Sequence, residues 1–237
     1  MQSVVYIYGD SIMRGTVIDE QQRYHSTISG FLERLANQFS IRFVNRSHFG
    51  ITVEKGKQIL QKDINKGLAC DFALLEFGGN DCSYAWDEVG KTPTADHRPA
   101  TEPDVFAREL QAMAQMLQNE NIEPVLMTLP PVDAQKHLDF IGQPPNNKKG
   151  ILSWLGDAQM IYRFHELYST AIRHVAAATN SLLVDVRAAF LDKHNINELV
   201  GPDGVHPSAQ GYALICEEFT KYIARRRGKN ELTLKNA

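Results

Sequence analysis

The chain has 237 residues, of which 43% are hydrophobic and 22% are charged, and its formal net charge at pH 7 is -3. This composition is typical of a folded globular protein and excludes a disordered, collagen-like or coiled-coil chain. The nearly balanced charge provides no sustained basic surface, so we expect no nucleic-acid partner.

The cysteines indicate a reducing compartment, and the hydropathy pattern indicates neither a signal peptide nor a membrane span. Cys70, Cys82 and Cys216 lie far apart without a CxxC pair, which argues against a disulfide framework and against a cysteine zinc site. Residues 4–8 form an apolar run that has neither a preceding basic segment nor a small-residue cleavage site, so we expect no signal peptide. No apolar stretch approaches the roughly 18 to 20 residues needed to span a bilayer. We therefore expect a cytoplasmic protein without a membrane partner, of unknown oligomeric state.

Short apolar runs alternate with helical patterns along the chain. Five runs are expected to form buried strands, at residues 4–8, 41–45, 72–77, 124–128 and 182–186. Helical spacing of apolar residues covers residues 26–38, 53–64, 104–119, 157–178 and 208–227. Parallel strands need a crossover connection, which a helix normally supplies. The alternation therefore predicts an α/β fold, a three-layer α/β/α sandwich around a parallel five-stranded sheet.

The length fits one α/β domain, predicted to span residues 1–227 and to be followed by a C-terminal tail at residues 228–237. Two connections, at residues 82–103 and 130–156, are longer than usual. Long loops in compact domains are usually lids, binding loops or disordered segments. We expect these two insertions to form a wall over a site.

Glycines and polar residues follow the predicted strands. Gly9-Asp10-Ser11 follows the first strand, Gly50 comes after the second, Gly79-Asn80-Asp81 after the third, and Asp203-Gly204-Val205-His206-Pro207 lies beyond the fifth. In an open parallel sheet, ligands bind outside the carboxyl ends of the strands. We therefore expect these four motifs to lie along one edge of the sheet.

The residue types in these motifs are those that acyl transfer requires. The hydroxyl of Ser11 is a weak nucleophile that needs a base, and His206 is the candidate. Asp203 can orient and stabilise the imidazole from the same short loop. The developing oxyanion needs hydrogen-bond donors, which the backbone N–H groups of Ser11 and Gly50 and the side-chain amide of Asn80 can supply. Asp203 and His206 can also help to begin the last helix, and the two roles are compatible.

Other polar residues near the motifs are expected to have structural roles. Asp10 and Asp81 lie beside tight glycine turns and should accept backbone hydrogen bonds that hold the loops. Cys82 should be an inert thiol, because nothing nearby in the sequence would lower its pKa. Trp86 and Trp154, in or at the end of the insertions, are candidates for an aromatic platform that binds substrate. Packing inside the wall is an equally good interpretation of both.

The four motifs, in this order, resemble blocks I, II, III and V of the SGNH hydrolase superfamily, also called GDSL-type esterases and lipases. The resemblance covers nearly the whole chain. It implies that Ser11 is the nucleophile, His206 the base and Asp203 its orienting acid, with Ser11, Gly50 and Asn80 as the oxyanion hole. It also implies a flavodoxin-like sandwich with strand order 2-1-3-4-5, and neither a metal nor an organic cofactor.

Two residues depart from the pattern of this superfamily. Ile12 follows the serine where leucine is usual, which is a conservative change. Ile51 follows the block II glycine where many members have a polar residue. Ile51 is therefore a candidate for shaping the acyl pocket.

The motifs together predict a serine esterase that cleaves a small acyl ester, with an acylated carbohydrate as one candidate, through an acyl-enzyme. Burying a long acyl chain requires an extended apolar wall, at about 0.8 kcal/mol for each methylene, and the two insertions are rich in charged and polar residues instead. A lysophospholipase or acyl-thioesterase is the alternative. In a different class, the chain would be a catalytically silent module that binds a small ligand. The sequence has no GxGxxG motif after a strand and no P-loop, which argues against a nucleotide or flavin binder.

Overall fold

The computed structural model describes residues 2–19, 21–26 and 28–235 of the chain. Five strands form one parallel sheet: β1 (Ser3–Gly9), β4 (Ile41–Asn45), β5 (Phe72–Glu76), β6 (Glu123–Met127) and β7 (Leu182–Val184). Their order across the sheet is β4-β1-β5-β6-β7. Counted along the chain, this is the predicted order 2-1-3-4-5, so the fold class is confirmed.

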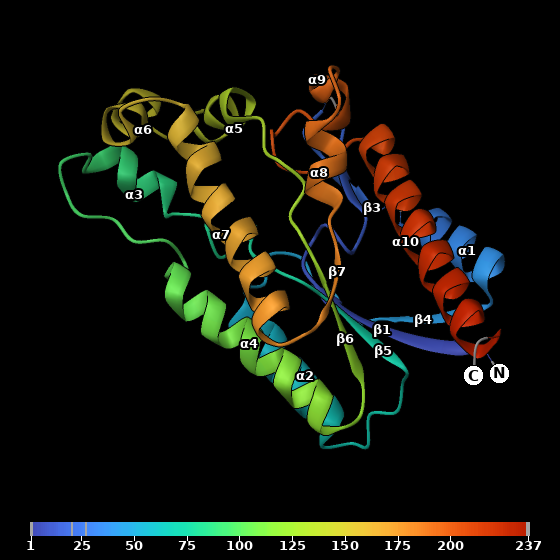
Figure 1. The fold of residues 1–237 in the computed structure, drawn as a ribbon. Coiled ribbons are helices and arrows are strands. Elements are labelled where there is room, and N and C mark those ends of the chain that lie inside the picture. Colours follow the sequence, from blue (N-terminus) through green and yellow to red (C-terminus); the bar gives the residue numbers. More distant parts are fainter. Residues whose placement is uncertain (1, 20, 27, 236–237) are drawn as a thin grey trace.

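Helices cover both faces of this sheet (Figure 1). One face carries α1 (Ile28–Phe39) and α10 (Ala209–Lys235), and the other carries α2 (Val53–Ile64), α4 (Pro103–Asn119) and α7 (Gln159–Ala178). Successive side chains of a strand point to opposite faces. Ile7 and Leu74 therefore pack toward α1 and α10, whereas Tyr8 and Leu75 pack toward the other three helices. Both faces are covered, which is why apolar residues on both faces dominate the central strands.

The two insertions contain helices where loops were expected. The first contains α3 (Trp86–Lys91), and the second contains α5 (Ala134–Ile141) and α6 (Lys148–Leu155). Side-chain caps begin the latter two, because Asp133 accepts a hydrogen bond from the backbone of Lys136 and Asn147 accepts one from Gly150. The three helices pack with the first turns of α7 around a separate apolar cluster, seen together in Figure 1.

Several short elements and boundaries differ from those expected. A hairpin of β2 (Thr16–Ile18) and β3 (Tyr24–Ser26) follows β1, and α8 (Val186–Leu191) and α9 (Ile196–Leu199) follow β7. The fifth strand ends at Val184, because Asp185 caps α8 through the backbone N–H of Ala188. Helix α10 continues past residue 227, so residues 228–235 of the expected tail are helical. Residues 236–237 lie outside the described part.

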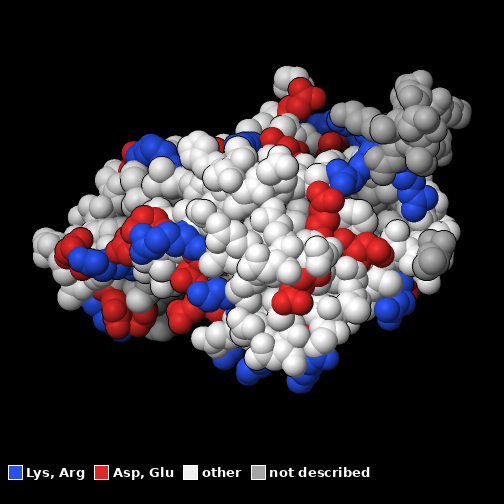
Figure 2. Space-filling view, turned by 60° about the horizontal axis from the view of Figure 1, so that its bottom comes forward, with Lys and Arg blue, Asp and Glu red and all other residues white. Residues whose placement is uncertain are grey.

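Three further features of the described residues concern surface charge, membrane-spanning helices and groups of metal-binding side chains. On the face shown in Figure 2, basic and acidic side chains lie intermixed around a broad uncharged area. Within the described ranges, no helix has the length and apolar character needed to cross a membrane. The same ranges contain no group of three or more His, Cys, Asp or Glu side chains placed to hold a metal ion.

Candidate active site

Three side chains from two distant parts of the chain form a continuous series of hydrogen bonds. Oγ of Ser11, in the loop after β1, lies 2.8 Å from Nε2 of His206, and Nδ1 of His206 lies 2.5 Å from Oδ2 of Asp203. An ionised carboxylate only accepts hydrogen bonds, so Nδ1 carries the ring proton and Nε2 accepts from the serine hydroxyl. All three residues are buried. This tautomer is the one that a base acting on Ser11 requires.

The short loop from Asp203 to His206 holds the acid and the base in one turn. Oδ1 of Asp203 accepts the backbone N–H groups of Val205 and His206 at 3.1 and 3.0 Å. Gly204 has a φ of +75°, and a Cβ there would lie 2.4 Å from the backbone nitrogen of His137. Both the conformation and the close approach require glycine at this position.

Hydrogen bonding keeps the Asp203 carboxylate charged despite its burial. Burial alone would raise the pKa of this carboxyl. The hydrogen bonds from the His206 ring and from the two backbone N–H groups outweigh that effect and lower the pKa below its usual value. Asp203 therefore accepts from His206 as an anion.

The loop that carries Ser11 is held from two sides. Oδ1 of Asp10 accepts the backbone N–H of Ile12 at 2.9 Å. The hydroxyl of Tyr212, from α10, lies 3.0 Å from each of the backbone carbonyl oxygens of Ile12 and Thr16, which share its one hydrogen. The interpretation of Asp10 as a residue that holds its loop is confirmed.

Asp10 also orients the side chain of Asn80. Nδ2 of Asn80 donates to Oδ2 of Asp10 at 2.9 Å, which leaves the second amide hydrogen for a ligand. Behind them, Oε2 of the fully buried Glu76 accepts the backbone N–H of Asp10 at 3.3 Å. Burial raises the pKa of Glu76 well above its usual value, and the charge of Asp10 raises it further. The buried pair therefore favours the protonated form of Glu76 more than an exposed glutamate would.

Asp81 ties three segments together near the site. Its Oδ1 accepts the backbone N–H of Val53, at the start of α2, at 3.0 Å and the hydroxyl of Thr101 at 2.7 Å. Burial raises the pKa of Asp81 to about 6, against the opposing effect of these hydrogen bonds. The structural role expected for Asp81 is confirmed.

Ser11 and His206 line a cavity of about 210 Å³. Both insertions contribute to its lining, so they do form a wall over the site. Their contributions are Cys82, Ser83 and Trp86 from the first insertion and Val132, His137 and Phe140 from the second. Asn80 also lines the cavity, with its amide beside Asp10 in the loop that carries Ser11.

The two tryptophans have different positions. Trp86 lines the cavity, whereas Trp154 is not among its lining residues and packs against Tyr84, with the ring centroids 4.9 Å apart. Cys82 lines the cavity, but burial raises the pKa of its thiol to about 12, consistent with the inert role expected.

Block II contributes an aromatic side chain to the cavity. Phe49 is a lining residue, whereas Gly50 and Ile51 are not. Gly50 has a φ of +74°, which explains the glycine, and Ile51 packs against the core on the α2 and α4 face. The oxyanion role of Gly50 and the pocket role of Ile51 stay predictions.

Sequence reasoning missed several residues of the cavity, among them two aromatic rings and two histidines. The exposed rings of Tyr24 and Phe49 lie against His206, with centroid distances of 5.3 and 6.1 Å. His137 and His165 line the cavity far from any motif in the sequence. For His165 a signal existed, because it occupies a buried position of the helical period of α7, where an apolar residue is usual.

Comparison with known proteins shows which family the chain belongs to. The pattern of the GDSL-like Lipase/Acylhydrolase family matches residues 7–214. A buried Ser-His-Asp series at the carboxyl edge of a parallel sheet is an arrangement that suits acyl transfer. The chain belongs to the GDSL-like Lipase/Acylhydrolase family, and it is accordingly a hydrolase of the class that acts on esters. A comparison with curated protein sequences gives no significant match.

Solved structures share this fold at low sequence identity. A lipase/acylhydrolase from Enterococcus faecalis superposes with a TM-score of 0.65 at 21% identity, covering 94% of this chain and 96% of that chain. An acetylxylan esterase from Geobacillus stearothermophilus gives 0.63 at 19% identity, covering 93% and 95%. A GDSL-like lipase from Bacteroides thetaiotaomicron gives 0.60 at 16% identity, covering 95% and 89%. Identities this low show a shared fold alone.

Proposed function

We propose that the protein is a serine esterase that hydrolyses small acyl esters through an acyl-enzyme. Ser11 is the nucleophile, His206 the general base and Asp203 the acid that orients it. The observation that carries this proposal is the series of contacts Ser11–His206–Asp203, at 2.8 and 2.5 Å, beside a cavity. A serine hydroxyl in this position transfers its proton to Nε2 as it attacks a carbonyl carbon.

The first half of the reaction forms the acyl-enzyme. Oγ of Ser11 bonds to the ester carbonyl carbon while Nε2 of His206 takes the hydroxyl proton. The negative charge that develops on the carbonyl oxygen accepts the free amide hydrogen of Asn80 and the backbone N–H groups of Ser11 and Gly50. His206 then returns the proton to the alcohol oxygen as the ester bond breaks, and the alcohol leaves.

The second half repeats these steps with water. Nε2 of His206 takes a proton from a water molecule, whose oxygen bonds to the acyl carbon. The same donors stabilise the second oxyanion, and the proton passes from His206 to Oγ of Ser11 as the carboxylic acid leaves. Asp203 stays ionised throughout and stabilises the imidazolium that forms in each half.

The size and lining of the cavity support a small acyl group on a polar alcohol, such as an acylated carbohydrate. Pockets for drug-sized ligands usually span roughly 300 to 1,000 Å³, and this cavity of about 210 Å³ is smaller. Apolar rings such as Phe164 share its walls with polar side chains such as His137 and Ser83. The structurally similar Geobacillus protein is named an acetylxylan esterase, which favours the same substrate class here.

Covalent labelling tests the proposal directly. A fluorophosphonate should modify Ser11 alone, as identified by mass spectrometry of peptides, with loss of esterase activity in proportion. The Ser11→Ala variant should be neither labelled nor active. Ser47→Ala is the matched control, because the Ser47 hydroxyl is also buried, yet has no hydrogen-bond partner among the described residues. This variant should be labelled like the wild type. An unlabelled Ser11 in an active protein would contradict the proposal.

A further inference from the structure

Two histidines outside the Ser-His-Asp series line the same cavity. His137 lies on α5 and His165 on α7, and the proposed mechanism uses neither. His165 is 5% exposed, and His137 is partly buried. A buried imidazole needs partners for both ring nitrogens, so the contacts of each ring decide what it offers to a ligand.

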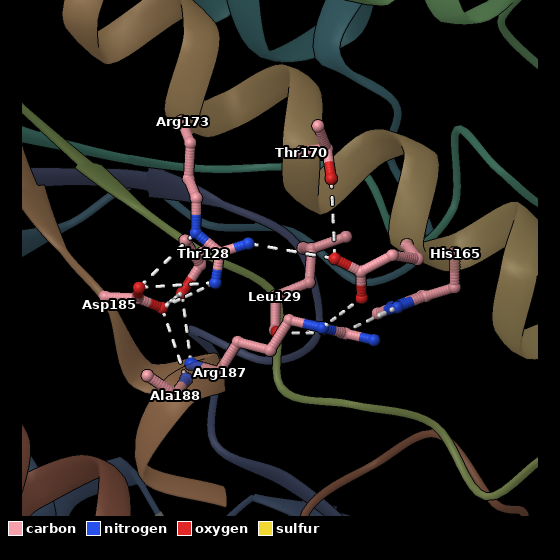
Figure 3. Close-up of polar contacts among 9 residues, drawn as sticks. Thr128, Leu129, His165, Thr170, Arg173, Asp185, Arg187 and Ala188 are labelled. Carbon is pink, nitrogen blue, oxygen red and sulfur yellow. Dashed lines mark hydrogen bonds and ion pairs between the residues drawn. The ribbon is translucent and has the colours of Figure 1, made fainter. Parts of the chain in front are cut away.

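The tautomer of His165 follows from its contact with Arg187. Nη1 of Arg187 lies 3.2 Å from Nδ1 of His165, and Figure 3 shows the arginine reaching from the start of α8 to the histidine on α7. A guanidinium group only donates hydrogen bonds, so Nδ1 of His165 must be the acceptor. The ring hydrogen of a neutral His165 is therefore on Nε2.

Arg187 is held in place and keeps His165 uncharged. Its fully buried side chain donates to the carbonyl oxygen of Leu129 at 3.2 Å and pairs with Glu166 at 2.6 Å (Figure 3). The guanidinium also lies over the ring of Tyr162, at 4.9 Å from its centroid. Burial and the charge of Arg187 lower the pKa of His165 well below its usual value. Protonation would place an imidazolium against a guanidinium.

His137 has the opposite tautomer. Its Nδ1 lies 2.9 Å from the backbone carbonyl oxygen of Asp203. A carbonyl oxygen only accepts hydrogen bonds, so Nδ1 of His137 carries the hydrogen and Nε2 has a free lone pair. Burial lowers the pKa of His137, although hydrogen bonding to Asp203 and the charge of that residue oppose the effect. His137 is therefore neutral and acts as an acceptor at Nε2.

The two Nε2 atoms are left for a ligand. Among the residues that the structure describes, none makes a hydrogen bond with Nε2 of His137 or of His165, and neither atom is sealed from the cavity. Both rings line the same cavity, which therefore contains a fixed donor at His165 and a fixed acceptor at His137.

We propose that His137 and His165 together bind one hydroxyl group of the substrate, with Nε2–H of His165 donating to its oxygen and Nε2 of His137 accepting its hydrogen. A hydroxyl is both a donor and an acceptor, which matches this pair. The pair selects esters that carry a free hydroxyl near the bond to be cleaved, as partly acylated polyols and esters of hydroxy acids do. An ester without the hydroxyl leaves both nitrogens unpaired, and sites of this kind discriminate strongly against such analogues. The inference rests on the esterase function proposed for Ser11.

Matched substrates test the hydroxyl preference. 2-Hydroxyethyl acetate and propyl acetate differ by a hydroxyl on the alcohol, whereas ethyl glycolate and ethyl propionate differ by one on the acyl group. The kcat/KM ratio within each pair is divided by the ratio of the alkaline hydrolysis rates, which removes the difference in chemical reactivity. We expect the wild type to favour the hydroxylated ester about tenfold in one pair, as for two net hydrogen bonds. The pair that responds shows which side of the ester the histidines contact.

Asparagine substitutions test the role of Nε2 in each histidine separately from that of Nδ1. His165→Asn and His137→Asn retain an amide near the position of Nδ1, which can satisfy Arg187 or the Asp203 carbonyl, but they remove Nε2. Either variant should reduce the hydroxyl preference to about threefold or less. His165→Gln places an amide N–H near the position of Nε2 and should restore part of the preference. His97→Asn is the control, because His97 lies outside the cavity lining, and it should leave the ratio unchanged. The ratio of kcat/KM between the two esters of a pair does not depend on the fraction of folded protein, so a partly unfolded variant still gives a valid value.

The tautomers can be measured without turnover. Two-bond ¹H–¹⁵N spectra of the imidazoles, recorded on Ser11→Ala protein between pH 6 and 8, should show His165 protonated on Nε2 and His137 on Nδ1. The opposite tautomer of either ring would overturn the inference. Lack of a hydroxyl preference in both pairs, or a preference that survives both asparagine variants, would overturn it too, even with Ser11 labelled and active. Failure of the labelling itself, with these tautomers observed, would instead contradict the esterase proposal.

Discussion

The side-chain amide of Asn80 donates a hydrogen bond to Oδ2 of Asp10 at 2.9 Å. The aspartate of the Gly-Asp-Ser motif therefore orients a donor that lies 70 residues further along the chain. Its other oxygen accepts the backbone N–H of Ile12, directly after Ser11. One buried carboxylate thus positions both the loop of the proposed nucleophile and the amide proposed to stabilise the oxyanion.

Removal of that amide should affect the chemical step. Asn80→Ala should lower kcat by about 10² to 10³, with little change in KM, because the amide hydrogen matters once negative charge develops on the carbonyl oxygen. Steady-state kinetics with 4-nitrophenyl acetate measures both constants. A large rise in KM at unchanged kcat would instead assign Asn80 to binding of the ground state.

Ser11 and His206, the proposed nucleophile and base, should behave as one unit. Ser11→Ala and His206→Ala should each reduce kcat to the residual level, and the double variant should be no slower than either alone, because the first substitution already removes the joint effect. The background rate of uncatalysed hydrolysis sets the reference. Losses that multiply in the double variant would show that the two residues act independently.

Arg187 should be essential for stability. Arg187→Ala leaves Glu166 and Nδ1 of His165 without their buried partner, so the free energy of unfolding should fall by about 3 kcal/mol or more. Arg163→Ala is the matched control, because the Arg163–Asp157 pair, at 2.7 Å, is half exposed. Its cost should stay below about 1 kcal/mol. Urea unfolding measures both, and equal losses would contradict the prediction.

Asp81 should make stability depend on pH. Its folded pKa of about 6 lies above the value of about 3.9 expected in the unfolded chain, so the folded state binds the proton more tightly. The contribution of Asp81 is therefore greatest below about pH 4 and decreases as the pH rises to about 6. Asp81→Asn keeps an oxygen acceptor for Val53 and Thr101 but cannot titrate.

The test of this prediction compares two unfolding curves at each pH. The stability of the wild type minus that of Asp81→Asn should decrease by up to about 3 kcal/mol between pH 4 and pH 6 and then stay constant. Urea unfolding at pH 4, 5, 6 and 7 provides the values. A difference that is constant, or that increases with pH, would contradict the pKa shift of Asp81.

The cavity should limit the length of the acyl group. For 4-nitrophenyl esters, kcat/KM should be highest from acetate to butyrate and fall for longer chains, because a cavity of about 210 Å³ has little room for further methylenes. Each methylene that is buried would otherwise add about 0.8 kcal/mol. If kcat/KM rises through eight or more carbons, a lysophospholipase or acyl-thioesterase is the better assignment.

The sequence by itself determined the sheet, the helices on its two faces and the four motifs beyond the strands. These features depend on local patterns: a short, largely apolar run such as residues 72–77 is typical of a buried strand, and three of the motifs follow a strand within a few residues. Parallel strands bring their carboxyl ends to one edge of the sheet, so the sequence alone predicted that Ser11, Asn80 and His206 lie near one another.

Only the tertiary structure decided what surrounds that group. The caps at Asp133 and Asn147 begin short helices inside a segment that resembles a loop, and the packing of those helices brings His137 to the cavity. The tautomer of His165 depends on Arg187, 22 residues away, and on the burial of both. A pattern along the chain reports which side chains are apolar, whereas the partner of a polar nitrogen is set by contacts between elements that are distant in sequence.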